Sequence, residues 1–161
     1  IGKYCMGAVH ASTSRETVMR LENEPMNVPE VLINLVDVFV IVRRYNVGNR
    51  IQRVVGELAE TAGIEKKMVL LSPVWSYDLA KHEFHEAAVS SIYRDKLAQV
   101  SGRSSKDIID EVNLRASLIR ILVERGIKDF KEASQIFNTY AVNPQEVIGK
   151  LGLKREDLLR P

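Results

Sequence analysis

The sequence Val38-Phe39-Val40-Ile41-Val42 is followed by Asn46-Val47-Gly48-Asn49, and together these stretches predict a β-hairpin. β-Branched and aromatic residues favour strands, and the Asn/Gly-rich stretch has the residues of a hairpin turn. A second strand is expected over residues 50–62 and a third over residues 67–77, with Gly63 and neighbouring charges in the turn between them. The three strands predict an antiparallel meander.

Before the hairpin, the sequence predicts a strand and two helices. Residues 4–11 form a short apolar run that is typical of a buried strand. Thr13 and Glu16 have the spacing of a capping box and predict the start of a helix. Pro29 predicts the start of a second, short helix that ends near Asp37.

After the hairpin region, strand signals end near residue 84 and four helices are expected. Ser104, Asp129 and Asn143 can each cap the start of one of the last three. The longest of them carries apolar residues at helical spacing, which we expect to face the core. They are Ile108, Ile109, Val112, Ala116, Ile119, Leu122 and Val123.

Composition is that of an ordinary folded protein. The 161 residues are 45% hydrophobic and 27% charged, with a net charge of +2 that does not require a nucleic-acid partner. The single cysteine, Cys5, excludes an intrachain disulfide and a cysteine-cluster metal site, which fits a reducing compartment. The apolar run of residues 31–42 is shorter than the roughly 20 residues of a membrane-spanning helix. Because the chain opens on Ile1, we expect a fragment or a processed product.

His10 is the only histidine in the first eighty residues, and it lies where the expected first strand meets the expected first helix. Ligands of α/β sheets bind beyond the carboxyl ends of strands, where backbone N–H groups of the next helix can face an anion. His10 is therefore a candidate phosphate sensor. A satisfied core or capping histidine is the alternative interpretation.

Other motifs are less informative. Gly2 and Gly7 have the spacing of a phosphate loop, but Ala8-Val9 stand where Lys and Ser/Thr are required. The stretch His82-Glu83-Phe84-His85-Glu86 fails the His-Glu-x-x-His pattern, so we expect a charged linker and no metal site. Trp75 and Tyr77 are more typical of core or interface packing than of a base-stacking surface.

Arg43, Arg44, Arg50 and Arg53 lie around the expected hairpin, two on each arm. Guanidinium groups suit phosphates and carboxylates of a neighbouring subunit equally well. Such arginines can also be the solvated ends of strands. The residue pattern leaves these interpretations open.

Three stretches in this order resemble the carboxyl-terminal half of type II/type IV secretion ATPases, a superfamily of pilus, archaellum, conjugation and competence motors. The first is a histidine box, and the resemblance extends over essentially the whole chain, including a helical tail like that of archaeal members. The stretches are Gly7-Ala8-Val9-His10-Ala11-Ser12, residues 29–37, and Arg50-x-x-Arg53-Val54-Val55-Gly56-Glu57-Leu58-x-Glu60.

This resemblance implies an α/β fold: the distal part of a RecA-like P-loop ATPase domain over residues 1–83, with a helical C-terminal subdomain over residues 84–161. His10 would be a catalytic residue near the γ-phosphate. Arg50 and Arg53 would contact the nucleotide or a neighbouring subunit. The phosphate loop and the acidic, magnesium-holding segments would precede the histidine box and so lie outside this chain.

The resemblance also implies partners and a location. The complete protein would bind ATP and Mg²⁺ and form a homo-oligomer, a hexamer in the family. It would act on a membrane assembly-platform protein from a cytoplasmic position at the inner face of the membrane. We expect this chain alone to bind neither ATP nor Mg²⁺ tightly and to have no ATPase turnover. The alternative function is a stand-alone protein-interaction or weak nucleic-acid-binding module without catalysis.

Overall fold

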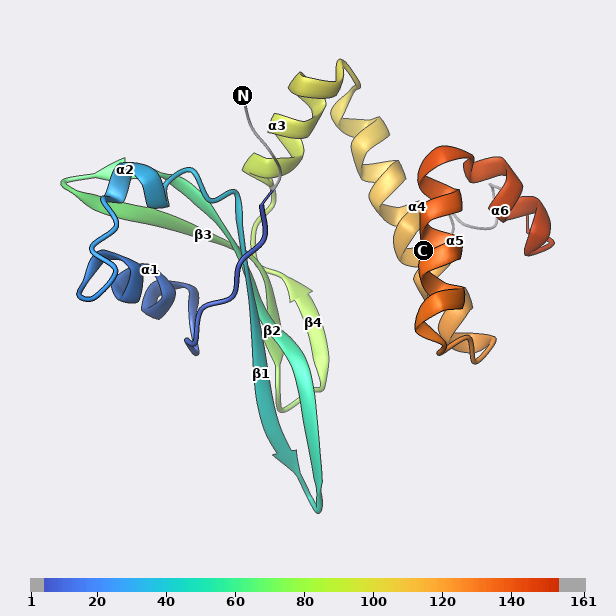
Figure 1. Ribbon diagram of the computed structural model, residues 1–161, viewed down its shortest axis with the longest axis horizontal. Helices are drawn as coiled ribbons and strands as arrows, with labels where there is room; N and C mark the ends of the chain where they lie inside the picture. The colour runs from blue at the N-terminus through green and yellow to red at the C-terminus, as the bar shows by residue number, and fades with distance from the viewer. Residues whose placement is uncertain (1–4, 154–161) are drawn as a thin grey trace. The chain divides into compact units, whose positions relative to one another are not determined.

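A computed structural model of the chain describes residues 5–153, which form a mixed α/β protein (Figure 1). Its sheet has four antiparallel strands in the order β1-β2-β3-β4. These are β1 (Val38–Val47), β2 (Arg50–Glu65), β3 (Met68–Asp78) and β4 (Glu83–Glu86). The predicted meander of the first three strands is confirmed, with Val47 paired to Arg50 beside the hairpin turn.

β4 corrects the expectation of a linker at residues 82–86. Tyr77 pairs with Phe84 and Ser76 with His85, so this polar segment joins the sheet through its backbone. Its four residues are too few and too polar to produce a strand signal in the sequence.

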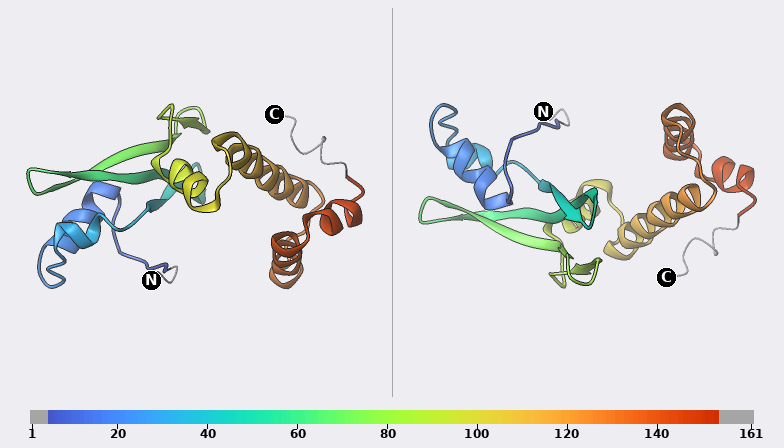
Figure 2. Two further views of the ribbon diagram at one scale, coloured as in Figure 1. Left: turned by 90° about the horizontal axis from the view of Figure 1, so that it is seen from above. Right: turned by 90° about the horizontal axis from the view of Figure 1, so that it is seen from below.

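Two helices, α1 (Ser14–Glu22) and α2 (Glu30–Ile33), cover one face of the sheet (Figure 2). The core between them and the sheet is made by Val18, Ile33, Phe39, Ile41 and Val69. Along β1, the buried residues 39 and 41 alternate with the exposed residues 40 and 42. One face of this strand therefore packs against the helices while the other is open within this part of the chain.

The expected strand over residues 4–11 is not formed. Residues 5–11 have no regular secondary structure, and Tyr4 lies outside the described residues. Cys5, which that strand would have buried, is exposed. A strand requires a hydrogen-bonding neighbour, and this segment pairs with neither edge strand of the described sheet, β1 or β4.

The chain divides into two compact units between Lys96 and Leu97. This division falls within α3 (Ile92–Ser101), whereas the boundary expected at residues 83–84 falls in β4. The helices of the second unit are α4 (Ser105–Glu124), α5 (Phe130–Val142) and α6 (Pro144–Lys150).

The predicted starts of these three helices are confirmed. The Ser104 side chain accepts a hydrogen bond from the backbone N–H of Asp107, and the Asp107 side chain accepts one from the Ser104 N–H, which makes a capping box. Asp129 and Asn143 cap α5 and α6 through their side chains, each of which accepts a hydrogen bond from the N–H three residues later.

The predicted core stripe of α4 is largely wrong. Leu118 and Leu122 pack with Tyr140 of α5 and Val147 of α6, and Leu114 packs with Ile148. Of the predicted stripe, residues 109, 112, 119 and 123 are exposed, while residues 108 and 122 are buried. Because α4 carries apolar residues on two sides, helical spacing alone does not identify which side is buried.

Candidate functional site

His10 is exposed and lies in the segment that leads into α1. It lines an open groove of about 550 Å³ together with the Glu16 and Arg20 side chains of α1. Val9, Met19 and the turn at Pro25-Met26 form the apolar part of the lining. The groove thus combines one imidazole, one guanidinium, the two carboxylates of Glu16 and Glu24 and the amide of Asn23 with apolar walls. The predicted role of His10 as a phosphate sensor stays a prediction.

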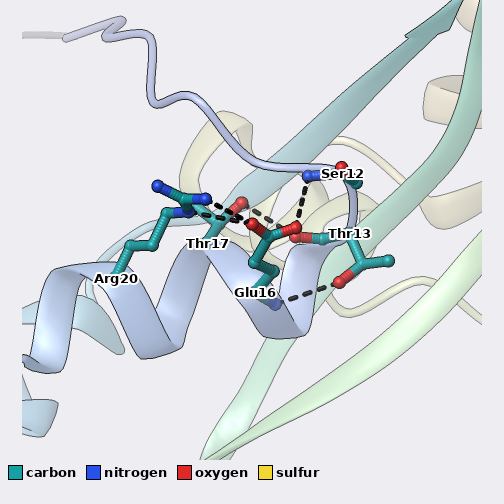
Figure 3. A network of polar contacts seen from close by, with 5 residues as sticks. All are labelled: Ser12, Thr13, Glu16, Thr17 and Arg20. Carbon is teal, nitrogen blue, oxygen red and sulfur yellow. Dashed lines mark hydrogen bonds and ion pairs between the residues drawn. The ribbon is translucent and has the colours of Figure 1, made fainter.

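The start of α1 is fixed by a small polar network beside this groove (Figure 3). Thr13 is the N-cap, and its hydroxyl accepts the Glu16 N–H at 3.0 Å. The Glu16 carboxylate reaches back to accept the Ser12 N–H at 2.7 Å and also pairs with Arg20 at 2.7 Å. The Ser12 N–H, and after it the Arg20 guanidinium, hold the pKa of the Glu16 carboxyl below its usual value.

A second set of contacts ties the segment containing His10 to the sheet. Arg43 of β1 donates from Nε to the Ser12 carbonyl at 3.2 Å, and its guanidinium lies 3.5 Å from the Glu57 carboxylate of β2. Glu57 also accepts a hydrogen bond from the Ser14 hydroxyl. A Cβ at Gly56 would lie 2.7 Å from the Arg43 Cδ atom. Glycine at position 56 therefore makes the space through which Arg43 reaches Ser12.

Arg50 and Arg53 are both exposed residues of β2 near the hairpin turn. The structure does not bring them to His10, because the end of the hairpin projects away from α1 (Figure 1). Side chains three residues apart on a strand point to opposite faces. Arg53 is instead the cross-strand partner of Arg44. Arg50 and Arg53 thus cannot both contact one small ligand from the same face.

Arg43 is the residue that the sequence did not distinguish from its neighbours. It belongs to the set of four arginines around the hairpin, but only its register in β1 shows which face it occupies. It follows residues 39 and 41, which alternate onto the α1 side of the sheet. Because residues 38–42 are all apolar, the sequence did not show which face of the strand is buried, and the accommodating glycine of β2 was recognisable only from the strand pairing.

The lining offers N–H donors from His10 and Arg20 beside the carboxylates of Glu16 and Glu24. Among residues 5–153, no group of three or more His, Cys, Asp or Glu side chains is placed to hold a metal ion. His82 lies elsewhere, with Nδ1 3.2 Å from the Tyr77 hydroxyl, and His85 is exposed on β4. No helix in the described part of the chain is both long and apolar enough to cross a membrane.

Comparisons with known proteins give relatives without a described function. No protein-family model matches the chain. Three proteins of Methanocaldococcus jannaschii, each described only as uncharacterized, are similar to it. The first is 20% identical over 147 residues, which are 89% of this chain and 20% of that protein. The second is 27% identical over 143 residues, 84% of this chain and 25% of that protein.

The third relative is 25% identical over 123 residues, which cover 75% of this chain and 45% of that protein. The chain therefore spans between 20% and 45% of the length of these relatives. The similarity runs through both compact units, because 89% of the chain is covered in the first comparison.

Proposed function

We propose that this chain is the C-terminal segment of a secretion or pilus-assembly motor ATPase, in which it senses the γ-phosphate, contacts neighbouring subunits and docks a membrane partner. The observation that carries the proposal is an exposed histidine in the run of residues 7–12, on a groove beside a capped helix. The order of this run, residues 29–37 and the β2 arginine strand supports it, as does the greater length of the relatives.

In this proposal the sheet is the distal part of a RecA-like domain, and His10 donates a hydrogen bond to a phosphate oxygen. Arg43 holds the Ser12 carbonyl and Glu57 accepts the Ser14 hydroxyl, so the segment carrying the imidazole is anchored at two residues that follow it. Such an anchored donor stabilises developing charge without reorganising during the reaction. The catalytic contribution of this chain is thus positioning of one N–H donor.

The residues of the groove fit a phosphate better than Mg²⁺. They offer His10 as a donor, and of the two carboxylates in the lining Glu16 is already engaged by Ser12 and Arg20, which leaves Glu24 alone. Mg²⁺ prefers several oxygen ligands, which the described residues do not gather here. ATP and Mg²⁺ would therefore be held in the complete homo-oligomer mainly by residues outside this chain, and Mg²⁺ there would neutralise phosphate charge.

The test uses the complete protein encoded by the reading frame that contains this chain. We expect His10→Ala to lower kcat by about 100-fold while changing ATP affinity much less, because the contact is made to the reacting phosphate. His85→Ala is the matched control, since His85 is exposed on β4. Unchanged turnover in His10→Ala would refute the sensing role.

The reading frame provides a second, simpler test. A Gly-x-x-x-x-Gly-Lys-Ser/Thr sequence within one domain length before Ile1 is expected. An initiator methionine immediately before Ile1 would refute the motor assignment and favour a non-catalytic interaction module.

A further inference from the structure

Two arginines face each other across the β1–β2 hairpin without a compensating charge. Arg44 and Arg53 are direct partners in the antiparallel ladder, and both are exposed. Directly opposite residues have Cβ atoms about 5 Å apart, and like charges at that spacing destabilise a sheet. Neither side chain makes an ion pair with another of the residues that the structure describes. The arginine pair is therefore a candidate binding site for an anion from solution.

The surrounding sequence adds to the positive potential of this hairpin. Arg43, Arg44, Arg50 and Arg53 are the only charged residues between Asp37 and Glu57, which leaves no carboxylate on the hairpin to neutralise them. Arg43 differs from the others because it is already engaged by Ser12 and Glu57.

The alternation of side chains separates the arginines by face. Arg44 follows residues 40 and 42 on the face that α1 and α2 leave open, and its partner Arg53 shares this face. Arg50, three residues before Arg53, lies on the opposite face with Arg43. Arg44 and Arg53 are the two of these arginines that lie directly opposite each other, so their side chains can reach one phosphate group together.

We propose that Arg44 and Arg53 form a two-arginine site for a phosphate group of a small polyphosphate such as a nucleotide. Guanidinium forks match phosphate oxygens in a bidentate manner, and an anion between the two side chains converts their repulsion into two attractions. The identification of the polyphosphate as a nucleotide rests on the proposed motor function. The resemblance implied that Arg50 and Arg53 contact the nucleotide; in this site Arg44 acts together with Arg53 instead.

The neighbouring aromatic residue favours a phosphate group over single-stranded nucleic acid. Binding of single strands combines arginines with aromatic rings on which bases stack. Tyr45 follows Arg44 directly, so strand alternation places its side chain on the other face of β1; its ring centroid lies 6.2 Å from that of Tyr77. The face with the arginine pair has no aromatic ring from β1 or β2. Trp75 of β3 shares that face through its pairing with Leu58, but its place in the register is opposite Val40, four residues from Arg44 along β1.

The test measures thermal unfolding of the 161-residue chain with sodium tripolyphosphate and with sodium chloride at matched ionic strength. The single tryptophan, Trp75, lies in β3 and reports the unfolding of the sheet by its fluorescence. We expect tripolyphosphate at a few times its dissociation constant to raise Tm by about 2–4 °C more than chloride. Arg44→Gln and Arg53→Gln should each abolish this extra rise, and Arg50→Gln, the matched control, should keep it.

The substitutions also have an expected effect without any anion. Because Arg44→Gln removes a like-charge pair, we expect it to raise Tm in sodium chloride, whereas Arg50→Gln should leave Tm nearly unchanged. This readout separates loss of a binding site from simple loss of stability.

Three outcomes would overturn the proposal: no extra rise in the unsubstituted chain, an equal loss in Arg50→Gln, or retention of the rise in both Arg44→Gln and Arg53→Gln. A parallel arm uses vesicles of phosphatidylglycerol and of phosphatidylcholine. Arg44-dependent binding to the anionic vesicles alone would replace the soluble polyphosphate by a lipid phosphate. These measurements need no turnover, so their result is independent of the His10→Ala test.

Discussion

Glu60 gives the sharpest stability prediction, because its carboxylate is buried and organises the start of a helix. It is 3% exposed on β2. One carboxylate oxygen accepts the hydroxyl of Ser91 at 2.5 Å, and the other accepts the backbone N–H of Ile92 at 2.7 Å. Ile92 is the first residue of α3, so Glu60 joins the sheet to the amino end of this helix.

The cost of removing this side chain follows from its two hydrogen bonds. Hydrogen bonds to charged groups contribute about 1.5–3 kcal/mol each, and buried donors left without a partner add to the loss. We therefore expect Glu60→Ala to lower the free energy of unfolding by about 3–5 kcal/mol. Glu60→Gln keeps one acceptor oxygen but turns an NH₂ group toward a donor, and we expect a loss of about 1–2 kcal/mol.

The assay is urea unfolding followed by the fluorescence of Trp75 in the adjacent strand. Glu65→Ala is the matched control, because Glu65 is an exposed glutamate at the end of the same strand and its loss should change stability by less than about 0.5 kcal/mol. If Glu60→Ala costs no more than Glu65→Ala, the assignment of Glu60 as the link between β2 and α3 is wrong.

Two further predictions concern the segment that carries His10. Gly56→Ala should push the Arg43 side chain away from Ser12, because the added Cβ would lie 2.7 Å from Cδ of the arginine. We expect the free energy of unfolding in urea to fall by about 1–2 kcal/mol. An unchanged unfolding midpoint would show that the Arg43 side chain moves aside without cost. The lowered pKa of Glu16 means that its contribution to stability is present at neutral pH and is lost as the pH falls below its usual value of 4.5. NMR titration of the Ser12 amide should show this transition in the unsubstituted chain and not in Glu16→Gln.

Local chemistry explains which elements were predictable from the sequence. The hairpin turn at residues 46–49 and the caps at Ser104, Asp129 and Asn143 are determined by residues close to one another in the chain. The same holds for α1, whose Thr13 cap and Glu16 lie within one turn. These elements appear at the expected positions because few distant contacts are needed to specify them.

The elements that were predicted wrongly depend on pairing between distant parts of the chain. Whether residues 5–11 or 83–86 become a strand depends on a neighbour elsewhere in the chain, and the segment with the weaker strand signal is the one that finds a partner in β3. The candidate site likewise has one part that local sequence predicts and one part that depends on contacts between distant residues. His10 was identifiable from its position before a capped helix, but the contact of Arg43 with Ser12 depends on strand register and on the space left by Gly56.

The contact between Arg43 and Ser12 also has a mechanical consequence. Arg43 belongs to the projecting hairpin, and the Ser12 carbonyl belongs to the short segment between His10 and α1. A load applied to the hairpin is therefore transmitted to the histidine segment through two side chains, Arg43 at Ser12 and Glu57 at Ser14, in addition to the longer covalent path through α1 and α2. Shortening Arg43 would remove the contact that lies nearer to His10 and leave the one at Ser14.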